Sequence, residues 1–237
     1  IAEEVTEIEE SRRLPVLVVA IPTAAQAQRL GLTLAQLEAH VLPALTISAA
    51  ETQQTIAQAL TKVQGGQQIA IRSGADCVLT MQHGNRTWLT DDGVIDETDR
   101  QRGAVVSNLP AGSIYTTVVE RETVGTLYVP HFGAATDVTL HFAQGRIVHI
   151  DAATGADALA AWLDSHSGEP RRISHIGLGL NPALHQPIGW TLVDEHIQGA
   201  LFVALGENRY MGGENVSSLN YDLALVGAVL EVDGRIV

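Results

Sequence analysis

The sequence predicts an α+β protein in which helices come first and a mainly antiparallel β-sheet follows. Before residue 67, apolar residues recur three to four positions apart, which is the period of a helix. After it, they alternate with polar residues, and turns such as Ser73-Gly74 and Gly84-Asn85 favour β-hairpins. We therefore expect a strand and helical segment over residues 1–66 and a β-rich domain over 67–237, together forming one compact unit.

The N-terminal segment shows one strand and three helices. Residues 1–13 are acidic and polar, which predicts an exposed, helical lead-in, and the valine-rich run 14–21 predicts a strand. Thr23 and Thr33 are candidate N-caps for the first two helices. The helices are expected over 24–30, over 34–42 with Leu34, Leu37, Val41 and Leu42 on one face, and over 48–63.

The β-rich part shows a series of short strands. Two helices interrupt them, at 156–166 and 191–196. After the hairpin between residues 69 and 88, strands are expected at 105–106, 114–119, 126–129, 137–142, 146–150, 172–178, 199–205, 222–230 and 235–237.

Composition excludes several classes of function. The net charge of −13 argues against nucleic acid and against anionic membrane surfaces, because little would neutralise phosphates. Apolar runs are too short to cross a bilayer. Cys77 is the single cysteine, which excludes an intramolecular disulfide and fits a cytoplasmic location.

General motifs of catalysis are absent from the sequence. There is no Cys-x-x-Cys, no His-Glu-x-x-His, no glycine-rich phosphate loop and no Gly-x-Ser-x-Gly. His131, His141 and His149 fall in strand-like segments, but their spacing predicts no cluster with carboxylates on one face. From these patterns alone, the chain is a globular α+β domain whose function stays open.

Short motifs along residues 15–237 follow the order of a known family. They are Ile21-Pro22-Thr23 with Gly31-Leu32-Thr33, and the segments 71–77, 108–117, 172–179, 194–206 and 215–222. Together they resemble the aminopeptidase T (M29) metallopeptidases and the related 2,5-dihydroxypyridine dioxygenases. The resemblance implies the fold of the C-terminal part of such an aminopeptidase, without its N-terminal domain, and a homodimer.

The resemblance also shows what has changed at the metal site. In the family, two glutamates, two histidines and an aspartate hold a pair of divalent ions that position a water. The corresponding positions here are Ser113, His175, Phe202, Asn220 and Asp222. Phenylalanine cannot bind a metal, serine and asparagine are neutral, and the His-x-Asp pair of the dioxygenases is broken by Asn220. We therefore expect no metal, no cofactor and no catalysis.

The glycines and turns around these positions are retained, so we expect the emptied cleft to persist as a ligand site. Arg121 or Arg172 would pair with a carboxylate of the ligand. The expected ligand contacts are Ser113, Tyr115, Arg121, His175, Phe202, Asn220, Tyr221 and Asp222.

Metal-depleted relatives of these peptidases resemble the peptide-binding accessory proteins of ribosomal-peptide natural-product clusters, such as those for crocagin-type alkaloids. The resemblance implies a non-catalytic homodimer that holds a precursor peptide for tailoring enzymes. Two alternatives stay open. One is a metallohydrolase or dioxygenase-like enzyme with a rearranged site at His175 and Asp222, and the other is a structural or regulatory subunit of a larger complex.

Overall fold

The computed structural model describes residues 14–102 and 105–237. A five-stranded sheet runs in the order β12 (Asn220–Leu225), β11 (Leu201–Gly206), β10 (Ile173–Gly179), β6 (Ser113–Thr117) and β4 (Leu89–Asp91). A seven-stranded sheet runs in the order β14 (Arg235–Ile236), β13 (Val229–Val232), β2 (Gln68–Ser73), β3 (Cys77–Gln82), β7 (Val124–Phe132), β8 (Ala135–Ala143) and β9 (Arg146–Asp151). A separate pair is formed by β1 (Val16–Val19) and β5 (Val106–Leu109).

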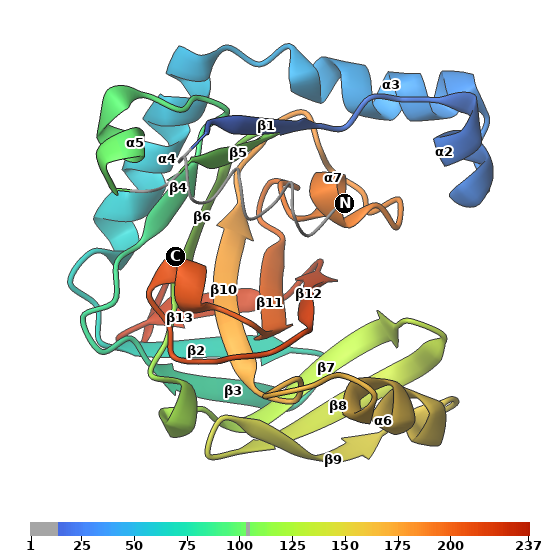
Figure 1. Ribbon diagram of the computed structural model, residues 1–237, viewed down its shortest axis with the longest axis vertical. Coiled ribbons are helices and arrows are strands. Elements are labelled where there is room, and N and C mark those ends of the chain that lie inside the picture. Colours follow the sequence, from blue (N-terminus) through green and yellow to red (C-terminus); the bar gives the residue numbers. More distant parts are fainter. Residues whose placement is uncertain (1–13, 103–104) are drawn as a thin grey trace.

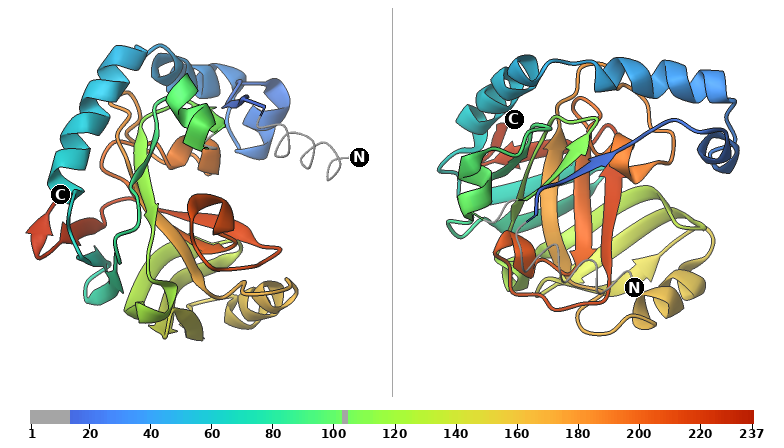
Figure 2. Two further views of the ribbon diagram at one scale, coloured as in Figure 1. Left: turned by 60° about the vertical axis from the view of Figure 1, so that its left-hand side comes forward. Right: turned by 45° about the horizontal axis from the view of Figure 1, so that its top comes forward.

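Most helices lie at one end and along one side of these sheets, and one helix packs on β8 and β9 at the other end (Figures 1 and 2). The helices are α2 (Ala24–Arg29), α3 (Leu34–Leu45), α4 (Ala49–Val63), α5 (Glu97–Arg102), α6 (Ala156–Asp164) and α7 (Thr191–Asp194), with the short 3-10 helices η1 (Glu120–Glu122) and η2 (Arg209–Met211). The predicted α+β class is confirmed. No helix in the described ranges combines the length and apolar character needed to cross a membrane.

The main core lies where the two larger sheets meet. Every residue of β10 and β11 is buried, so these central strands are covered on both faces. A continuous cluster joins inward-facing residues of both sheets, among them Ile71, Leu127, Leu140, Ile114, Ile176 and Val203. Each such side chain contributes roughly 1.5–3 kcal/mol by leaving water, and this burial holds the central strands rigidly in place.

The N-terminal helices begin where the sequence predicted. Thr23 accepts a hydrogen bond from the Gln26 amide, and Thr33 forms a reciprocal capping box with Gln36, which confirms both N-caps. These helices pack in a second core that includes Leu37 and Val41, together with Leu184, Val193, Ile197 and Ala200 from the later part of the chain. Leu34 and Leu42 are exposed, so the buried apolar face of that helix is narrower than the sequence predicted.

Two expectations about the elements were wrong. The strand expected at 222–230 is two strands, because a turn after Leu225 sends β12 and β13 into different sheets. β1 and β5 pair in parallel, while the two larger sheets are antiparallel as the sequence predicted. α5 was not expected, because its polar sequence shows no apolar period. The predicted helical lead-in at 1–13 lies outside the described residues.

Candidate functional site

Most of the predicted site residues lie on one face of the five-stranded sheet. The strand register aligns Tyr115 of β6, Gly177 of β10 and Phe202 of β11 in one row across the sheet. Residues directly opposite in antiparallel strands, and residues two positions along a strand, point to the same side. This side, which we call the site face, therefore carries Ser113, Tyr115, His175, Phe202, Asn220 and Asp222.

Two predicted contacts lie elsewhere. Tyr221 falls between Asn220 and Asp222 and so points to the opposite face, where its ring stacks on Phe132 with centroids 5.2 Å apart. Arg121 belongs to η1 and lines a different hollow. Neither residue is part of the site face, because strand alternation and a separate loop direct them away from it.

The centre of the site face is apolar. Phe202 is 3% exposed, and its ring lies so close over Gly177 that a Cβ atom there would come within 1.9 Å of Cζ. The same ring meets His175 edge-on, with centroids 5.9 Å apart. Gly177 therefore makes the space that the phenyl ring fills, and this ring lies in the middle of the five positions that the resemblance compares with metal ligands.

His175 is held by partners on both sides. Its Nε2 atom lies 2.9 Å from Oδ1 of Asp222. Its Nδ1 atom lies 2.9 Å from the hydroxyl of Ser174, which in turn donates to the Glu207 carbonyl oxygen at 2.9 Å. A hydroxyl with its hydrogen committed in this way accepts from the imidazole, so Nδ1 carries a hydrogen. The His175–Asp222 contact is close but is not a formed hydrogen bond, because Oδ1 of Asp222 is buried without a hydrogen-bond partner among the described residues.

A buried charge pair on the same side of the sheet as the site face was missed by the sequence analysis. Nδ1 of His196 lies 3.1 Å from the Leu192 carbonyl oxygen, and its Nε2 lies 3.1 Å from Oδ2 of Asp91. Both acceptors require a donor, so both nitrogens carry hydrogen and His196 is an imidazolium paired with a carboxylate. Asp91 also accepts from the Ser107 hydroxyl at 2.6 Å and from the Asn108 amide group at 2.7 Å.

The pKa values of this pair agree with its geometry. Burial opposes charge on His196, but the hydrogen bond and negative charge of Asp91 outweigh it and raise the pKa of His196. Burial likewise opposes charge on Asp91, but the hydrogen bond from His196 outweighs it and lowers the pKa of Asp91. Nothing in the local sequence around Asp91 signals this role, because its partner lies far away in the chain.

Glu195 stands beside this pair at the edge of the site face. A Cβ atom on Gly179 would come within 2.7 Å of the Glu195 carbonyl oxygen, so this loop packs directly on β10. The Glu195 side chain is 15% exposed and lies 3.8 Å from Nδ1 of His196. Burial raises the pKa of Glu195 to about 7, and the nearby charges of Asp222 and Asp91 add to this effect.

Replacing Glu195 should change stability in a pH-dependent way. Its folded-state pKa of about 7 lies above the ordinary 4.5, so the folded protein loses stability as pH rises between these values. Glu195→Gln stays neutral at every pH. We expect it to alter the free energy of unfolding little near pH 4.5 and to raise it by roughly 2–3 kcal/mol at pH 8. Urea denaturation at both pH values measures this, with exposed Glu122→Gln as the control. An equal change at both pH values would contradict the raised pKa.

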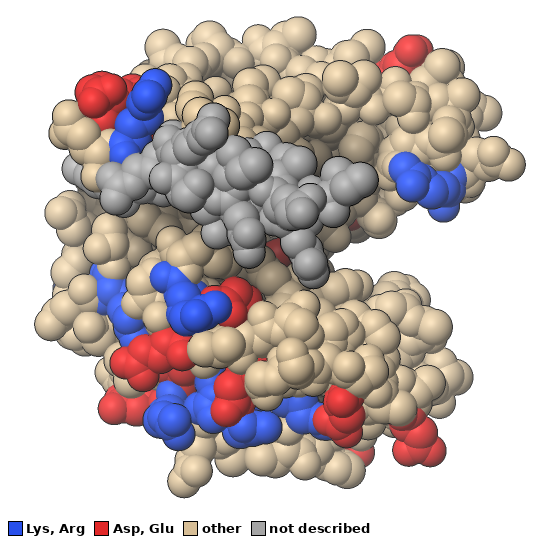
Figure 3. Space-filling view, viewed as in Figure 1, with Lys and Arg blue, Asp and Glu red and all other residues tan. Residues whose placement is uncertain are grey.

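Two tyrosines border the site face. Burial, together with the charge of Asp91, raises the pKa of Tyr115, which therefore stays a neutral hydroxyl. Tyr210 of η2 is 65% exposed, and its hydroxyl accepts a hydrogen bond of 2.8 Å from the Asn220 side chain. Asn220 thus orients Tyr210 at the rim. Figure 3 shows a deep hollow on this side of the molecule, between the arm with α2 and α3 and the part with β7, β8 and α6.

The prediction that the histidines form no cluster with carboxylates is wrong. Nε2 of His141 and of His149 lie 2.7 Å and 3.0 Å from the two oxygens of Asp151. The β8–β9 register shifts by one residue after His141, which leaves Val148 unpaired and turns His149 to the side of His141. This bulge is invisible in residue spacing. Within the described ranges, no set of three or more such side chains is placed to hold a metal ion.

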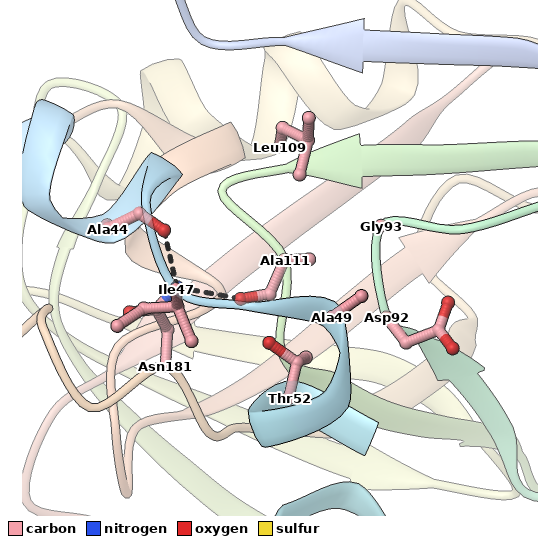
Figure 4. Close-up of a pocket in the computed structure, with 9 residues that line it drawn as sticks. All are labelled: Ala44, Ile47, Ala49, Thr52, Asp92, Gly93, Leu109, Ala111 and Asn181. Atoms are coloured by element: carbon pink, nitrogen blue, oxygen red, sulfur yellow. Dashed lines mark hydrogen bonds between the residues drawn. The ribbon is translucent and has the colours of Figure 1, made fainter.

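A small cavity of about 110 Å³ lies away from the site face, beside the loop that joins α3 and α4 (Figure 4). The Asn181 amide donates to the carbonyl oxygens of Ala44 at 3.2 Å and Ala111 at 2.8 Å. These bonds tie the end of α3 to the start of β6. The cavity is too small for a ligand beyond a few water molecules, and we interpret Asn181 as a structural link.

Comparison with known families identifies the family to which this chain belongs. The model of the NicX family, 2,5-dihydroxypyridine 5,6-dioxygenase, matches residues 32–237. The chain belongs to this family. Within the family fold, it is similar to the 2,5-dihydroxypyridine dioxygenase of Pseudomonas putida KT2440, with 21% identity and a TM-score of 0.68 over 93% of this chain and 69% of that one.

This NicX-family chain is also similar to AmpT of Thermus thermophilus, with 17% identity and a TM-score of 0.57. The alignment covers 82% of this chain and 56% of AmpT, so the chain spans little more than half of that protein. No curated protein matches it. The predicted kinship with the dioxygenases is confirmed, and at 17% identity the likeness to AmpT concerns the fold.

The site face of this NicX-family chain does not fit the metal that the resemblance implies. Phe202 places a ring where an imidazole would be needed, and Ser113 and Asn220 offer only neutral oxygens or an amide. His175 and Asp222 are the remaining strong donors, and they contact each other. A two-donor set does not bind a catalytic ion firmly, so no chemical step through a metal follows from this arrangement.

Proposed function

We propose that this family member binds a peptide on its site face and has no catalytic role. The single observation that carries the proposal is the Phe202 ring packed over Gly177 in the middle of the five positions that the resemblance compares with metal ligands. An apolar floor with a few fixed polar groups around it is typical of ligand sites. Here the polar groups are the His175–Asp222 pair, Tyr115 and Glu195.

The edge of the sheet supports a peptide as the ligand. β12 is the outermost strand of the five-stranded sheet, and its outer edge pairs with no other strand in the described ranges. An extended peptide can add to such an edge through main-chain hydrogen bonds, while alternate side chains enter neighbouring pockets. Asn220 and Asp222 of β12 point to the site face, so a peptide on this edge would have its side chains beside Phe202 and Tyr210.

The resemblance noted above points to a precursor peptide, presented to tailoring enzymes by a homodimer, as the ligand class. The runner-up is an enzyme with a rearranged site at His175 and Asp222. The two functions predict different metal contents for the purified protein. A bound ion needs several ligands, whereas a peptide needs only the face and the edge described here.

The test combines metal analysis with a titration. Protein purified without chelator should contain less than stoichiometric zinc, iron or manganese. A library of fluorescent, C-terminally amidated hexapeptides should contain members that bind in a polarisation assay. Tyr210→Ala should weaken binding about tenfold, because an aromatic anchor at the rim contributes on the order of 1–2 kcal/mol.

Ile236→Ala is a matched control, because Ile236 is exposed like Tyr210 but lies on β14 of the other sheet. It should leave the peptide affinity unchanged. Absence of binding by the wild-type chain would refute the proposed function. A stoichiometric metal that is lost in both His175→Ala and Asp222→Ala would favour the enzyme instead.

A further inference from the structure

A second hollow, of about 350 Å³, lies at the beginning of β10 and apart from the site face. Its walls come from η1, from the loop that leads into β10 and from the loop that precedes β12. Its lining includes Glu120, Arg121, Glu169, Arg172, Glu214 and Asn215. The volume falls at the lower end of the range for small-ligand sites.

The walls of this hollow are fixed by the backbone. The Glu169 amide donates to the Val216 carbonyl oxygen at 2.8 Å, and the Ser218 amide donates to the Ser167 carbonyl oxygen at 3.1 Å. Gly168 lies so close to this strand-like contact that a Cβ atom there would meet the Val216 oxygen at 2.1 Å. The hollow is therefore a preformed feature of two loops joined side by side.

A buried guanidinium faces this hollow. Arg172 is 5% exposed, donates from Nε to Glu169 at 3.2 Å and donates from one terminal nitrogen to the Gln144 carbonyl oxygen at 3.4 Å. Its remaining N–H groups have no acceptor among the described residues. The unbonded terminal nitrogen is not sealed from water but opens to the hollow, so a ligand oxygen there can accept from it in place of a water molecule.

Among the described residues around the hollow, one cation has no carboxylate partner. The carboxylate of Glu120 is satisfied by the Asn208 side chain at 2.9 Å, by the Glu214 amide at 2.8 Å and by Arg86 at 3.3 Å. Glu169 is shared by Arg172 and Arg146. Arg121 is exposed and forms no ion pair within the described ranges. Acidic and basic side chains are interleaved on the lower left of the molecule in Figure 3, in contrast to the largely uncharged hollow at the right.

We propose that this second hollow binds the carboxylate of an amino-acid- to dipeptide-sized ligand through Arg121 and Arg172. The planar guanidinium fork matches a carboxylate and binds it with paired hydrogen bonds. A singly charged anion is favoured over a phosphate dianion, because the carboxylates of Glu120, Glu169 and Glu214 would repel additional negative charge. The inference goes beyond the proposed function, since neither Phe202 nor Asp222 lines this hollow.

The test uses the full chain and three probes in calorimetric titrations. N-acetyl-alanyl-alanine as the free acid should bind at least tenfold more tightly than its C-terminal amide. Inorganic phosphate should bind more weakly than the free acid. Arg121→Gln should remove most of the preference for the acid, because a charge-assisted hydrogen bond is lost. Arg235→Gln, which also removes an exposed arginine, should keep the preference.

Arg172→Lys is a second test variant, because it keeps the positive charge but removes the planar guanidinium. It should weaken binding of the free acid about tenfold. If that variant does not fold, the Arg121 series decides alone. Equal affinity for acid and amide, no binding of the acid, or phosphate binding as tightly as the acid would each overturn the proposal. The amidated peptide used for the site face should bind Arg121→Gln and wild type alike, so the two proposals can fail separately.

Discussion

Asp91→Ala should destabilise the protein by about 3–5 kcal/mol, the usual cost of breaking a buried, hydrogen-bonded ion pair. The variant removes the acceptor of the Ser107 hydroxyl, the Asn108 amide and Nε2 of His196 at once. It also leaves the His196 imidazolium without a counter-charge in a position that is fully buried. Urea denaturation at pH 6, followed by circular dichroism, measures the loss.

Asp92→Ala is the matched control, because Asp92 is the next residue along the chain but is only partly buried. It accepts from Gln53 at 2.8 Å and from the Val94 amide at 2.9 Å, and its loss should cost about 1 kcal/mol or less. A similar cost for both variants would show that the Asp91–His196 pair is not formed.

The same pair gives stability a pH dependence of known sign. The pKa of His196 in the folded state is raised above the ordinary 6.5. The stability that His196 contributes is therefore complete below pH 6.5 and is lost as pH rises through the raised pKa. Asp91 has a pKa lowered below the ordinary 3.8, so its contribution is lost only as pH falls through the lowered value. The difference between wild type and Asp91→Ala should therefore shrink in alkaline solution.

Local features of the fold were predictable, because neighbouring residues determine them. Helix starts follow from side-chain caps, and those at Thr23 and Thr33 form as expected. Strands follow from alternation, but alternation does not say which strand pairs with which. The continuous apolar run from Leu223 hides a turn between two sheets, and the parallel β1–β5 pair joins segments that are far apart in the chain.

The candidate site was predictable only as far as the motifs reach. They identified the positions of Ser113, His175, Phe202, Asn220 and Asp222, which the register brings onto one face. They did not identify Asp91, whose partner is His196, or the bulge that joins His141 to His149. Long-range pairing and one-residue register shifts are decided by tertiary packing, so residue spacing carries no sign of them.

Phe202→Ala should cost about 3–5 kcal/mol, because it empties a buried space that no neighbouring side chain can fill. Gly177→Ala alone should also destabilise, by about 1–3 kcal/mol, since the new methyl group would overlap the Phe202 ring. With the ring removed, the same change at Gly177 should be neutral or slightly stabilising, because alanine is less flexible than glycine in a strand. The two changes should therefore be strongly coupled in their effects on the free energy of unfolding.

Denaturation of the wild type, both single variants and the double variant closes this cycle. Ala44→Gly, in the second core, which does not include Phe202, supplies an uncoupled partner for Phe202→Ala, and the costs of that pair should add. If Gly177→Ala costs the same with and without the Phe202 ring, the ring does not lie over the glycine. The site face would then lack its apolar floor, and the peptide site proposed on it would lose its main structural support.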